Sequence, residues 1–313
     1  MNLNKPKFWD KRISITSILI FPITLIVLII IFFKKKFSKL KYYKIPIICV
    51  GNIYIGGTGK TPISIFLAKE LLSLGRNPVI LKKYYKNQND ENELIKNNFK
   101  NFILCEDRDI GIRKAEKNLH DSVILDDGFQ DYKIKKNLSI ICFNKKQLIG
   151  NGLVLPSGPL RETLVSLKNA NIVLINGDKD RKFEEKILGI NKNLDIFYSK
   201  YIPSNIEDFK NKKLLALAGI GNPENFFDLI EEYGLKIYEK MIFPDHYVFS
   251  KNEILNIIKK AKDNKLEIIM TEKDFFKIRN FEIDNLKYLK VSLVINKKEK
   301  LINIINNLYE KNY

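Results

Sequence analysis

A glycine-rich stretch in the first quarter of the chain carries residue types that bind phosphate. The β-type apolar run Ile45–Val50 leads into it, and Gly59-Lys60-Thr61 ends it where a helix is expected to begin. Glycines let backbone N–H groups approach phosphate oxygens, a lysine adds a cation, and a threonine hydroxyl can ligate Mg²⁺. The helix N-terminus adds partial positive charge. The predicted nucleotide-binding residues are Gly56, Gly57, Thr58, Gly59, Lys60 and Thr61.

The spacing of this loop departs from the usual phosphate-binding motif. Tyr54 stands five residues before Gly59, where a glycine is usual, and Gly56 and Gly57 lie inside the loop instead. A strand–helix turn without a ligand is therefore the alternative interpretation. The strand before the loop and the helix after it favour phosphate binding, because the mechanism needs both.

Two adjacent aspartates end a second strand-like run. Val123–Leu125 is followed by Asp126-Asp127-Gly128. In P-loop enzymes an aspartate at such a strand end holds Mg²⁺, directly or through water. Neighbouring strand residues point in opposite directions, so we expect one carboxylate to reach the metal and the other to fix the backbone, and which does which stays open. A turn without a metal is the alternative.

A loop with several glycines and prolines, residues 150–160, leads into Arg161 and Glu162. A guanidinium group can stabilise the charge of a transferring phosphoryl group, which is the predicted role of Arg161. The carboxylate of Glu162 can join the ligands of Mg²⁺. Favourable charge in the first turn of a helix would explain Glu162 but not Arg161.

The chain has two histidines, and one of them lies in a loop where it could take part in catalysis. His246 ends Phe243-Pro244-Asp245-His246, where it can act as a base or orient one. The alternative is a turn before a helix capped by Ser250 and Glu253. His120, at an expected helix end, is interpreted as structural. In Thr271–Asp274, which follows a strand-like run, we favour a helix cap over a role at a nucleotide base.

The N-terminal segment is predicted to be a membrane anchor. Ile13–Phe33 contains no charged residue, and a helix of that length, at ~1.5 Å per residue, reaches about 30 Å, the thickness of a bilayer's hydrocarbon core. A cleaved signal peptide is disfavoured, because the run is too long and no small-residue cleavage site follows. A helix that lies in the interface is a second alternative. The lysines that follow favour a cytoplasmic globular part: Lys34, Lys35, Lys36, Lys39, Lys41 and Lys44.

The charge and the cysteines limit the function classes. The net charge is +18, but the basic residues are scattered and no basic strand carries RNA-binding aromatics. We therefore predict no nucleic-acid partner, whereas an anionic membrane surface remains a reasonable one. Cys49, Cys105 and Cys142 lie in or beside apolar runs without C-x-x-C spacing, which is typical of buried thiols in a reducing compartment.

Strand-like and helix-like runs alternate after the anchor, which predicts an α/β fold of the P-loop NTPase type with a doubly wound, mostly parallel sheet. Ligands in such sheets bind beyond the carboxyl ends of the strands, where the glycine loop lies. The predicted parts are the anchor and its basic flank at 1–44, a P-loop domain at 45–204 and a smaller α/β domain at 205–313. The expected strands are 45–50, 78–81, 102–104, 123–125, 138–143, 172–175, 214–217, 235–242 and 268–270.

Taken together, the motifs resemble the tetraacyldisaccharide 4′-kinase family, LpxK, of lipid A biosynthesis. The matching words, in chain order, are VGNIYIGGTGKTP, DDGFQ, GNGLVLPSGPLRE, ALAGIGNPENFF, FPDHYVFS and TEKD. The resemblance covers nearly the whole chain. It implies transfer of the γ-phosphate of ATP, with Mg²⁺, to the 4′-hydroxyl of a tetraacyl disaccharide 1-phosphate at the cytoplasmic face of the inner membrane. The product would be lipid IVA, and we expect a monomer.

The resemblance also implies roles for single residues. The phosphate and metal positions that it carries over are Lys60, Thr61, Asp126, Asp127, Arg161 and Glu162. The family's catalytic base is an aspartate in a Gly-Asp-Glu word, and its best counterpart here is Asp90 in Asn89-Asp90-Glu91. His246 matches a histidine that supports this base, so the two domains are expected to close over ATP. Residues 81–86, Leu-Lys-Lys-Tyr-Tyr-Lys, differ from the family's Ser-Arg-Gly-Tyr-Gly-Arg-like segment.

Two other functions stay open at this stage. One is a membrane-tethered P-loop ATPase or GTPase that acts as a switch, which would need no lipid acceptor. The other is a catalytically inactive relative that binds only nucleotide or anionic lipid. The segment 82–86 is the best support for an inactive relative, whereas Lys60, Thr61, Asp126, Arg161 and His246 argue against it.

Overall fold

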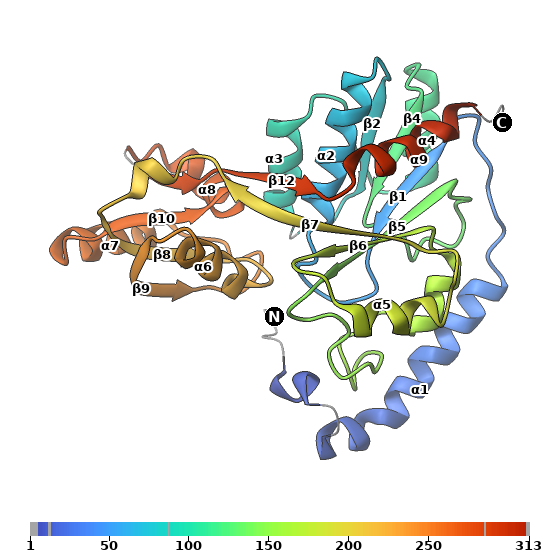
Figure 1. Cartoon of the computed structure of the whole chain (residues 1–313), viewed down its shortest axis with the longest axis horizontal. Helices are drawn as coiled ribbons and strands as arrows, with labels where there is room; N and C mark the ends of the chain where they lie inside the picture. Colours follow the sequence, from blue (N-terminus) through green and yellow to red (C-terminus); the bar gives the residue numbers. More distant parts are fainter. Residues whose placement is uncertain (1–5, 12–13, 87, 285, 311–313) are drawn as a thin grey trace. The chain divides into compact units, whose positions relative to one another are not determined.

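The computed structural model describes residues 6–11, 14–86, 88–284 and 286–310 (Figure 1). The chain divides into two compact units. The larger unit contains residues 6–84, 99–200 and 294–310, and the smaller unit contains residues 85–98 and 201–293. The smaller unit therefore takes in a short segment from before residue 204, and the last residues return to the larger unit. The three-part division expected from the sequence stays a prediction.

The larger unit is built on a sheet that, among the described residues, has eight strands in the order β12-β7-β6-β5-β1-β4-β2-β3. Every pairing from β3 to β7 is parallel, which confirms the predicted doubly wound sheet. The bounds are β1 Ile47–Gly51, β2 Pro78–Lys83, β3 Phe102–Cys105, β4 Ser122–Asp126, β5 Leu138–Asn144, β6 Ile172–Asn176, β7 Asp195–Pro203 and β12 Val291–Ile295.

Helices cover both faces of this sheet (Figure 1). Ile47 and Cys49 point to one face, because alternate strand residues share a side, and there the core includes residues of α4 (Arg108–Lys117) and α5 (Arg181–Leu188). Helix α2 (Lys60–Ser73) contacts β1, β2 and β4, and α9 (Lys298–Glu310) packs beside it. Strands buried on both faces explain the continuous apolar runs of the sequence.

The smaller unit repeats this plan around a parallel sheet with four described strands in the order β11-β10-β8-β9. Leu214 and Ala216 face a core that includes α6, whereas Leu215 and Leu217 face a core that includes α7 and α8. The strands are β8 Lys213–Ala218, β9 Lys236–Ile242, β10 Glu267–Thr271 and β11 Lys287–Leu289. The helices are α3 Asn89–Asn98, α6 Pro223–Glu232, α7 Lys251–Asp263 and α8 Glu272–Ile278.

The N-terminal helix α1 (Ile15–Lys36) is, among the described residues, the one helix long and apolar enough to cross a membrane. Ile13, the first residue of the predicted anchor, lies outside the described residues. The helix packs along its length on the larger unit. The Thr24 hydroxyl donates to Ser157 Oγ at 2.8 Å, and Val27, Leu28 and Ile31 pack against a cluster formed by Tyr54, Val154 and Leu160.

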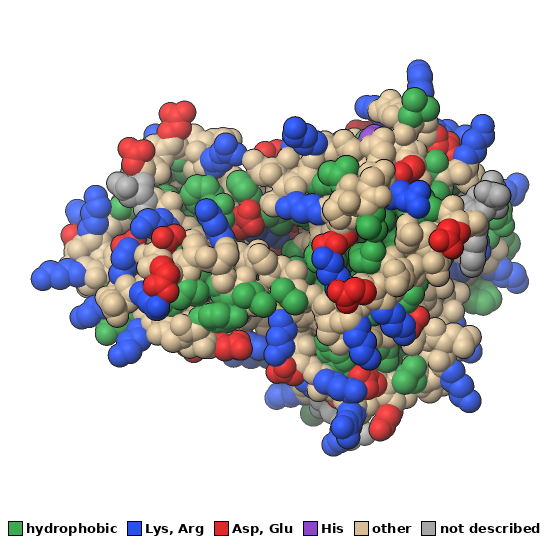
Figure 2. Space-filling view, turned by 45° about the horizontal axis from the view of Figure 1, so that its top comes forward, with side chains coloured by type: hydrophobic (Ala, Val, Ile, Leu, Met, Phe, Trp, Pro, Cys, Tyr) green, Lys and Arg blue, Asp and Glu red, His purple; other side chains and the backbone are tan. Residues whose placement is uncertain are grey.

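Most other side chains of α1 are exposed and apolar, among them Ile18, Leu19, Ile23, Ile26, Ile29, Ile30, Phe32 and Phe33. One helix face thus packs on the larger unit, and the other faces present exposed apolar side chains. Elsewhere, Lys and Arg side chains are spread over the face seen in Figure 2 and alternate with Asp and Glu. The basic charge is therefore distributed on this face and does not gather into one stripe.

Candidate active site

The glycine loop connects β1 to α2, as its sequence predicted. Gly59 precedes α2 in the left-handed conformation, with φ of 83°, and Gly56 has φ of 106°. Residues with a Cβ rarely adopt these angles, so both positions favour glycine. The Asn52 amide donates to the buried hydroxyl of Thr58 at 2.9 Å, which ties the loop to the end of β1.

Tyr54, which departs from the usual glycine spacing, has a structural explanation. Its side chain is buried and packs with Val154 and Leu160 against α1. Its backbone also forms an isolated bridge with Leu160. The tyrosine therefore packs against the loop that leads to Arg161. The glycines that a phosphate site needs lie farther along the chain.

Asp126 lies at the end of β4, between β1 and β2, and is fully buried. Its Oδ2 accepts hydrogen bonds from Thr61 Oγ1 at 3.0 Å and from Lys82 Nζ at 2.7 Å, and its Oδ1 accepts one from Ser64 Oγ at 3.1 Å. The structure thus joins the predicted pair Thr61 and Asp126. Ser64 and Lys82 were not predicted, although Lys82 stands at a strand end beside the expected metal site.

The buried pair of Lys82 and Asp126 gives a stability prediction. Lys82→Met leaves the Asp126 carboxylate without its cation, and breaking a buried pair in this way costs about 3–5 kcal/mol. We expect the free energy of unfolding to fall by about that amount at neutral pH, as measured by urea denaturation. Lys83→Met, at the half-buried neighbouring position, is the control. Equal losses in the two variants would mean that the pair has no special role.

Asp127 lies beside two predicted phosphate-binding cations. Arg161 Nη1 lies 2.8 and 3.0 Å from its two carboxylate oxygens, and Lys60 Nζ lies 3.7 Å from Oδ1. Burial raises the pKa of Asp127, but the charges of Lys60 and Arg161 outweigh it and lower the pKa to about 2. Its φ of 59° turns the residue out of the strand direction. The structure therefore brings Lys60, Asp127 and Arg161 together, and their roles toward phosphate and metal stay predictions.

Glu162 has other partners. It is buried, and its carboxylate forms an ion pair with Lys35, in the last turn of α1. Burial and the charge of this carboxylate together raise the pKa of Tyr132. The residue after Arg161 is thus tied to the N-terminal helix. Its predicted role as a metal ligand stays a prediction.

The residues around α2 suit a magnesium ion by their chemistry. Thr61, Asp126 and Asp127 offer hydroxyl and carboxylate oxygens, the donors that Mg²⁺ prefers, and Mg²⁺ usually takes one or two carboxylates plus phosphate oxygens. In this structure Lys82 forms an ion pair with Asp126, and Arg161 forms one with Asp127. The donor set at the phosphate-loop end of the larger unit is therefore chemically suited to a nucleoside triphosphate and a divalent cation, and the metal site stays a prediction.

A second cluster of polar side chains lies within the smaller unit. His246, on the loop after β9, points Nδ1 at the Asp90 carboxylate, 2.9 Å from Oδ1 and 3.0 Å from Oδ2. Asp90 is buried at the start of α3. Burial raises the pKa of Asp90, but the hydrogen bond with His246 and the charge of Lys273 lower it to about 2. The structure thus brings together the predicted base and the histidine predicted to support it, which are 156 residues apart in the chain.

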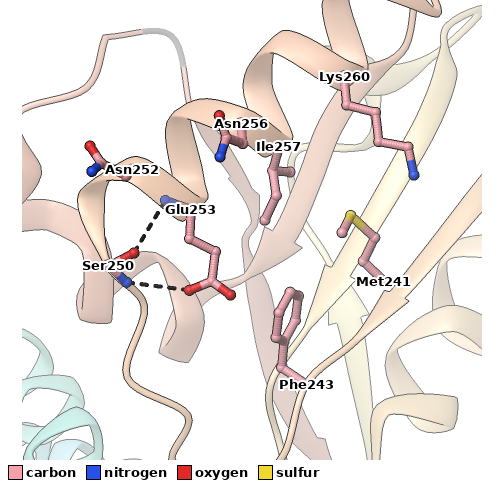
Figure 3. A pocket seen from close by; sticks show the side chains of 8 residues that line it. All are labelled: Met241, Phe243, Ser250, Asn252, Glu253, Asn256, Ile257 and Lys260. Atoms are coloured by element: carbon pink, nitrogen blue, oxygen red, sulfur yellow. Dashed lines mark hydrogen bonds between the residues drawn. The ribbon is translucent and has the colours of Figure 1, made fainter.

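The two capping motifs expected nearby are formed. Ser250 and Glu253 make a full capping box at the start of α7, and the Thr271 hydroxyl accepts from Asp274 N at 3.1 Å at the start of α8. Next to the Asp245–His246 loop, β9 and α7 border an open groove whose apolar lining residues are Met241, Phe243 and Ile257 (Figure 3). Ser250 and Glu253, which form the capping box, also line this groove.

The chain is similar to one family of known proteins over nearly its whole length. The family described as LpxK, tetraacyldisaccharide-1-P 4′-kinase, matches residues 16–310. A tetraacyldisaccharide 4′-kinase of Pelagibacter ubique (strain HTCC1062) is 41% identical, with 100% of both chains covered. One from Francisella tularensis subsp. novicida (strain U112) is 31% identical over 93% of this chain and 99% of its own.

A solved structure is also similar. The crystal structure of the "apo" form of LpxK from Aquifex aeolicus in complex with ATP has a TM-score of 0.71 and 25% identity. It covers 94% of this chain and 99% of its own. Sequence and fold therefore lead to the same family.

Proposed function

Because this chain belongs to the tetraacyldisaccharide-1-phosphate 4′-kinase family, LpxK, we propose that its two side-chain clusters carry the two halves of one phosphoryl transfer. The chain is an ATP-dependent kinase that phosphorylates the 4′-hydroxyl of a tetraacyl disaccharide 1-phosphate, and the product is the lipid A precursor lipid IVA. The observation that carries the proposal is the convergence of Lys60, Asp127 and Arg161 at the start of α2.

The larger unit holds the nucleotide in this proposal. Backbone N–H groups of residues 56–61 and the ammonium of Lys60 bind the outer phosphates of ATP. Arg161 leaves Asp127 for the γ-phosphoryl group and neutralises charge that develops during transfer. Thr61, Asp126 and Asp127 would hold Mg²⁺, with Glu162 as a further candidate. When bound, the ion supplies charge neutralisation at the phosphates.

The smaller unit supplies the base. Asp90 accepts the proton of the 4′-hydroxyl while that oxygen forms its bond to the γ-phosphorus and the bond to the ADP oxygen breaks. A pKa of about 2 keeps Asp90 ionised at neutral pH, which is the form that can accept a proton. The bond from His246 fixes the orientation of the carboxylate.

The test of the function is direct. Labelled γ-phosphate from ATP should appear on a tetraacyl disaccharide 1-phosphate presented in detergent micelles, and ATP should be consumed only when this lipid is present. Hydrolysis without lipid would instead favour a switch ATPase, and bound ATP without product would favour an inactive relative. The monomeric state and the lack of a nucleic-acid partner remain predictions.

We further propose that α1 holds the enzyme on the cytoplasmic face of the inner membrane by lying in the interface. The contacts with the larger unit run along the helix, from Ser17 beside Asn151 to Lys35 beside Glu162. A helix bound to a polar protein along its length does not have all its faces available for hydrocarbon. The exposed apolar side chains and the lysines of the last turn are suited to an anionic membrane surface.

Membrane binding should therefore depend on exposed isoleucines of α1. The triple change Ile23→Ser, Ile26→Ser and Ile30→Ser removes three apolar side chains, each worth about 1.5–3 kcal/mol when buried. We expect binding to anionic vesicles to fall more than about tenfold in a flotation assay. The control carries serine at three other exposed apolar positions, Ile110, Leu119 and Val248. Equal flotation of variant and control would exclude this face as the membrane contact.

A further inference from the structure

Lys273 lies at the centre of the acid–base cluster, although the sequence favoured only a helix cap for this motif. Its Nζ is 2.9 Å from Asp245 Oδ1, 3.2 Å from Asp90 Oδ2 and 3.6 Å from Glu91 Oε1. Only 15% of its side chain is exposed. A lysine that reaches three carboxylates inside the fold differs from a solvated surface charge, and such an arrangement needs an explanation.

The helix that carries Lys273 is firmly fixed. Thr271 caps α8, and the fully buried Asp274 accepts a hydrogen bond from Gly219 N at 2.9 Å. Lys277, one helical turn after Lys273, donates to Gly219 O at 2.7 Å and lies 3.7 Å from Asp90 Oδ2. The spacing i, i+4 places both lysines on one helix face. The ammonium of Lys273 is thus held in place by the scaffold of the smaller unit.

The ammonium also accounts for a group of potential metal ligands. Asp90, Asp245 and His246 offer ligand atoms within 4.8 Å of one another, a spacing that could hold an ion. Lys273 Nζ contacts two of these three residues, and so it provides the cation that their carboxylates require. Burial lowers the pKa of Lys273, but the charges of Glu91, Asp245 and Asp90 outweigh this and raise it above its usual value. The lysine therefore stays charged.

Lys273 contacts or supports both halves of the acid–base pair. Asp245 Oδ1, which Lys273 contacts, also accepts from the backbone N of His246 at 3.0 Å. His246 has φ of 58°, a conformation that costs free energy in a non-glycine residue and needs support from its surroundings. Lys273 thus supports the histidine through Asp245 and contacts Asp90 directly.

We propose that Lys273 is a positioning residue of the phosphoryl transfer, which holds the Asp90 carboxylate and the His246 ring in their reactive alignment. The inference rests on the proposed function, in which Asp90 is the base. Lys273 itself takes no proton in the reaction. Without its charge, the carboxylates of Asp90, Glu91 and Asp245 repel one another, and the bond between Asp90 and His246 loses its fixed geometry.

The kinetic test compares Lys273→Met with Lys273→Arg and with the control Lys262→Met on the exposed face of α7. For Lys273→Met we expect kcat to fall about 10- to 100-fold, part of the ~10²–10⁴ that a positioned base contributes, with the KM for ATP changed less than about twofold. Lys273→Arg keeps the charge and should recover most of kcat. Lys262→Met should match the wild type.

A spectroscopic test does not depend on turnover. The chain has two histidines, so imidazole NMR gives signals from His246 and from His120 as an internal control. In Lys273→Met the His246 Nδ1 resonance should lose the shift caused by its bond to Asp90, whereas the His120 signal should not move. Lys273→Arg should retain both signals. If Lys273→Met does not fold, Lys273→Gln replaces it as the uncharged variant.

The outcomes separate this inference from the proposed function. An active wild type and a Lys273→Met variant with unchanged kcat and His246 signal would overturn the role of Lys273 and leave the kinase function intact. Parallel losses in Lys273→Met and Lys273→Arg, with an unmoved His246 signal, would also overturn it, because they indicate a structural role. An inactive wild type would contradict the proposed function, and the NMR comparison would still decide whether Lys273 aligns the pair.

Discussion

Replacing Lys60 with alanine is expected to lower the rate of lipid phosphorylation by a factor of about 10²–10³. The ammonium lies beside Asp127 and Arg161 at the start of α2, where the charge of the outer phosphates must be neutralised. Loss of one preorganised electrostatic contact of this kind lowers kcat about 10²–10³-fold. Transfer of labelled γ-phosphate to the lipid acceptor measures the effect.

The matched control for this variant is Lys69→Ala, an exposed lysine on the same helix. It should retain wild-type activity, because it lies nine residues past the loop on the solvent side of α2. Substantial product from Lys60→Ala would exclude the glycine loop as the phosphate site. Product from the wild type and far less from Lys60→Ala would also rule out an inactive relative.

The second large effect is expected at Asp90. Asn in its place keeps the size of the side chain and can still hydrogen-bond to His246, but it cannot accept a proton. We expect kcat to fall about 10²–10⁴-fold, while ATP binding, measured by calorimetry, stays unchanged because the residues proposed to hold the nucleotide belong to the larger unit. The comparison also tests the placement of the base, which rested on a single resemblance to a Gly-Asp-Glu word.

Glu93→Gln is the control for Asp90→Asn, since the side chain of Glu93 on the same helix is 47% exposed and forms an ion pair with the nearby Lys96. The two substitutions make the same chemical change, from carboxylate to amide, at a buried and a half-exposed position. Similar rates for Asp90→Asn and the wild type would mean that another group takes the proton.

The sequence was sufficient for those parts of the fold whose signals are local. Strands buried on both faces appear as continuous apolar runs, so β1, β2, β4–β6, β8 and β10 were predicted with small errors at their ends. Strands β3 and β9 were predicted as well, although they are less buried. Strand β7 was missed, and its sequence DIFYSKYIP interrupts the apolar pattern with polar residues; strand β12 was also missed. Helix α3 was missed because its sequence, NDENELIKNN, is almost entirely polar.

The candidate site divides in the same way. The glycines, the adjacent aspartates and the Arg-Glu pair can be recognised in the sequence by residue type and spacing. In the structure, Lys60 and Arg161 both lie beside Asp127. Lys82 and Lys273 could not be singled out, because two lysines among the 54 basic residues of the chain look like ordinary surface charge. Their roles come from burial beside carboxylates far away in the sequence.

The return of the last residues to the larger unit has a consequence for biosynthesis. Helix α9 buries Leu301, Ile305 and Leu308, and the Tyr309 hydroxyl donates to Ser122 Oγ at 2.7 Å. Domains of a nascent chain usually fold in order from the N-terminus, but these contacts cannot form until residues 298–310 have been translated. The ribosome therefore releases the segment that completes the nucleotide-binding unit only after the whole smaller unit has emerged, although the phosphate loop is made first.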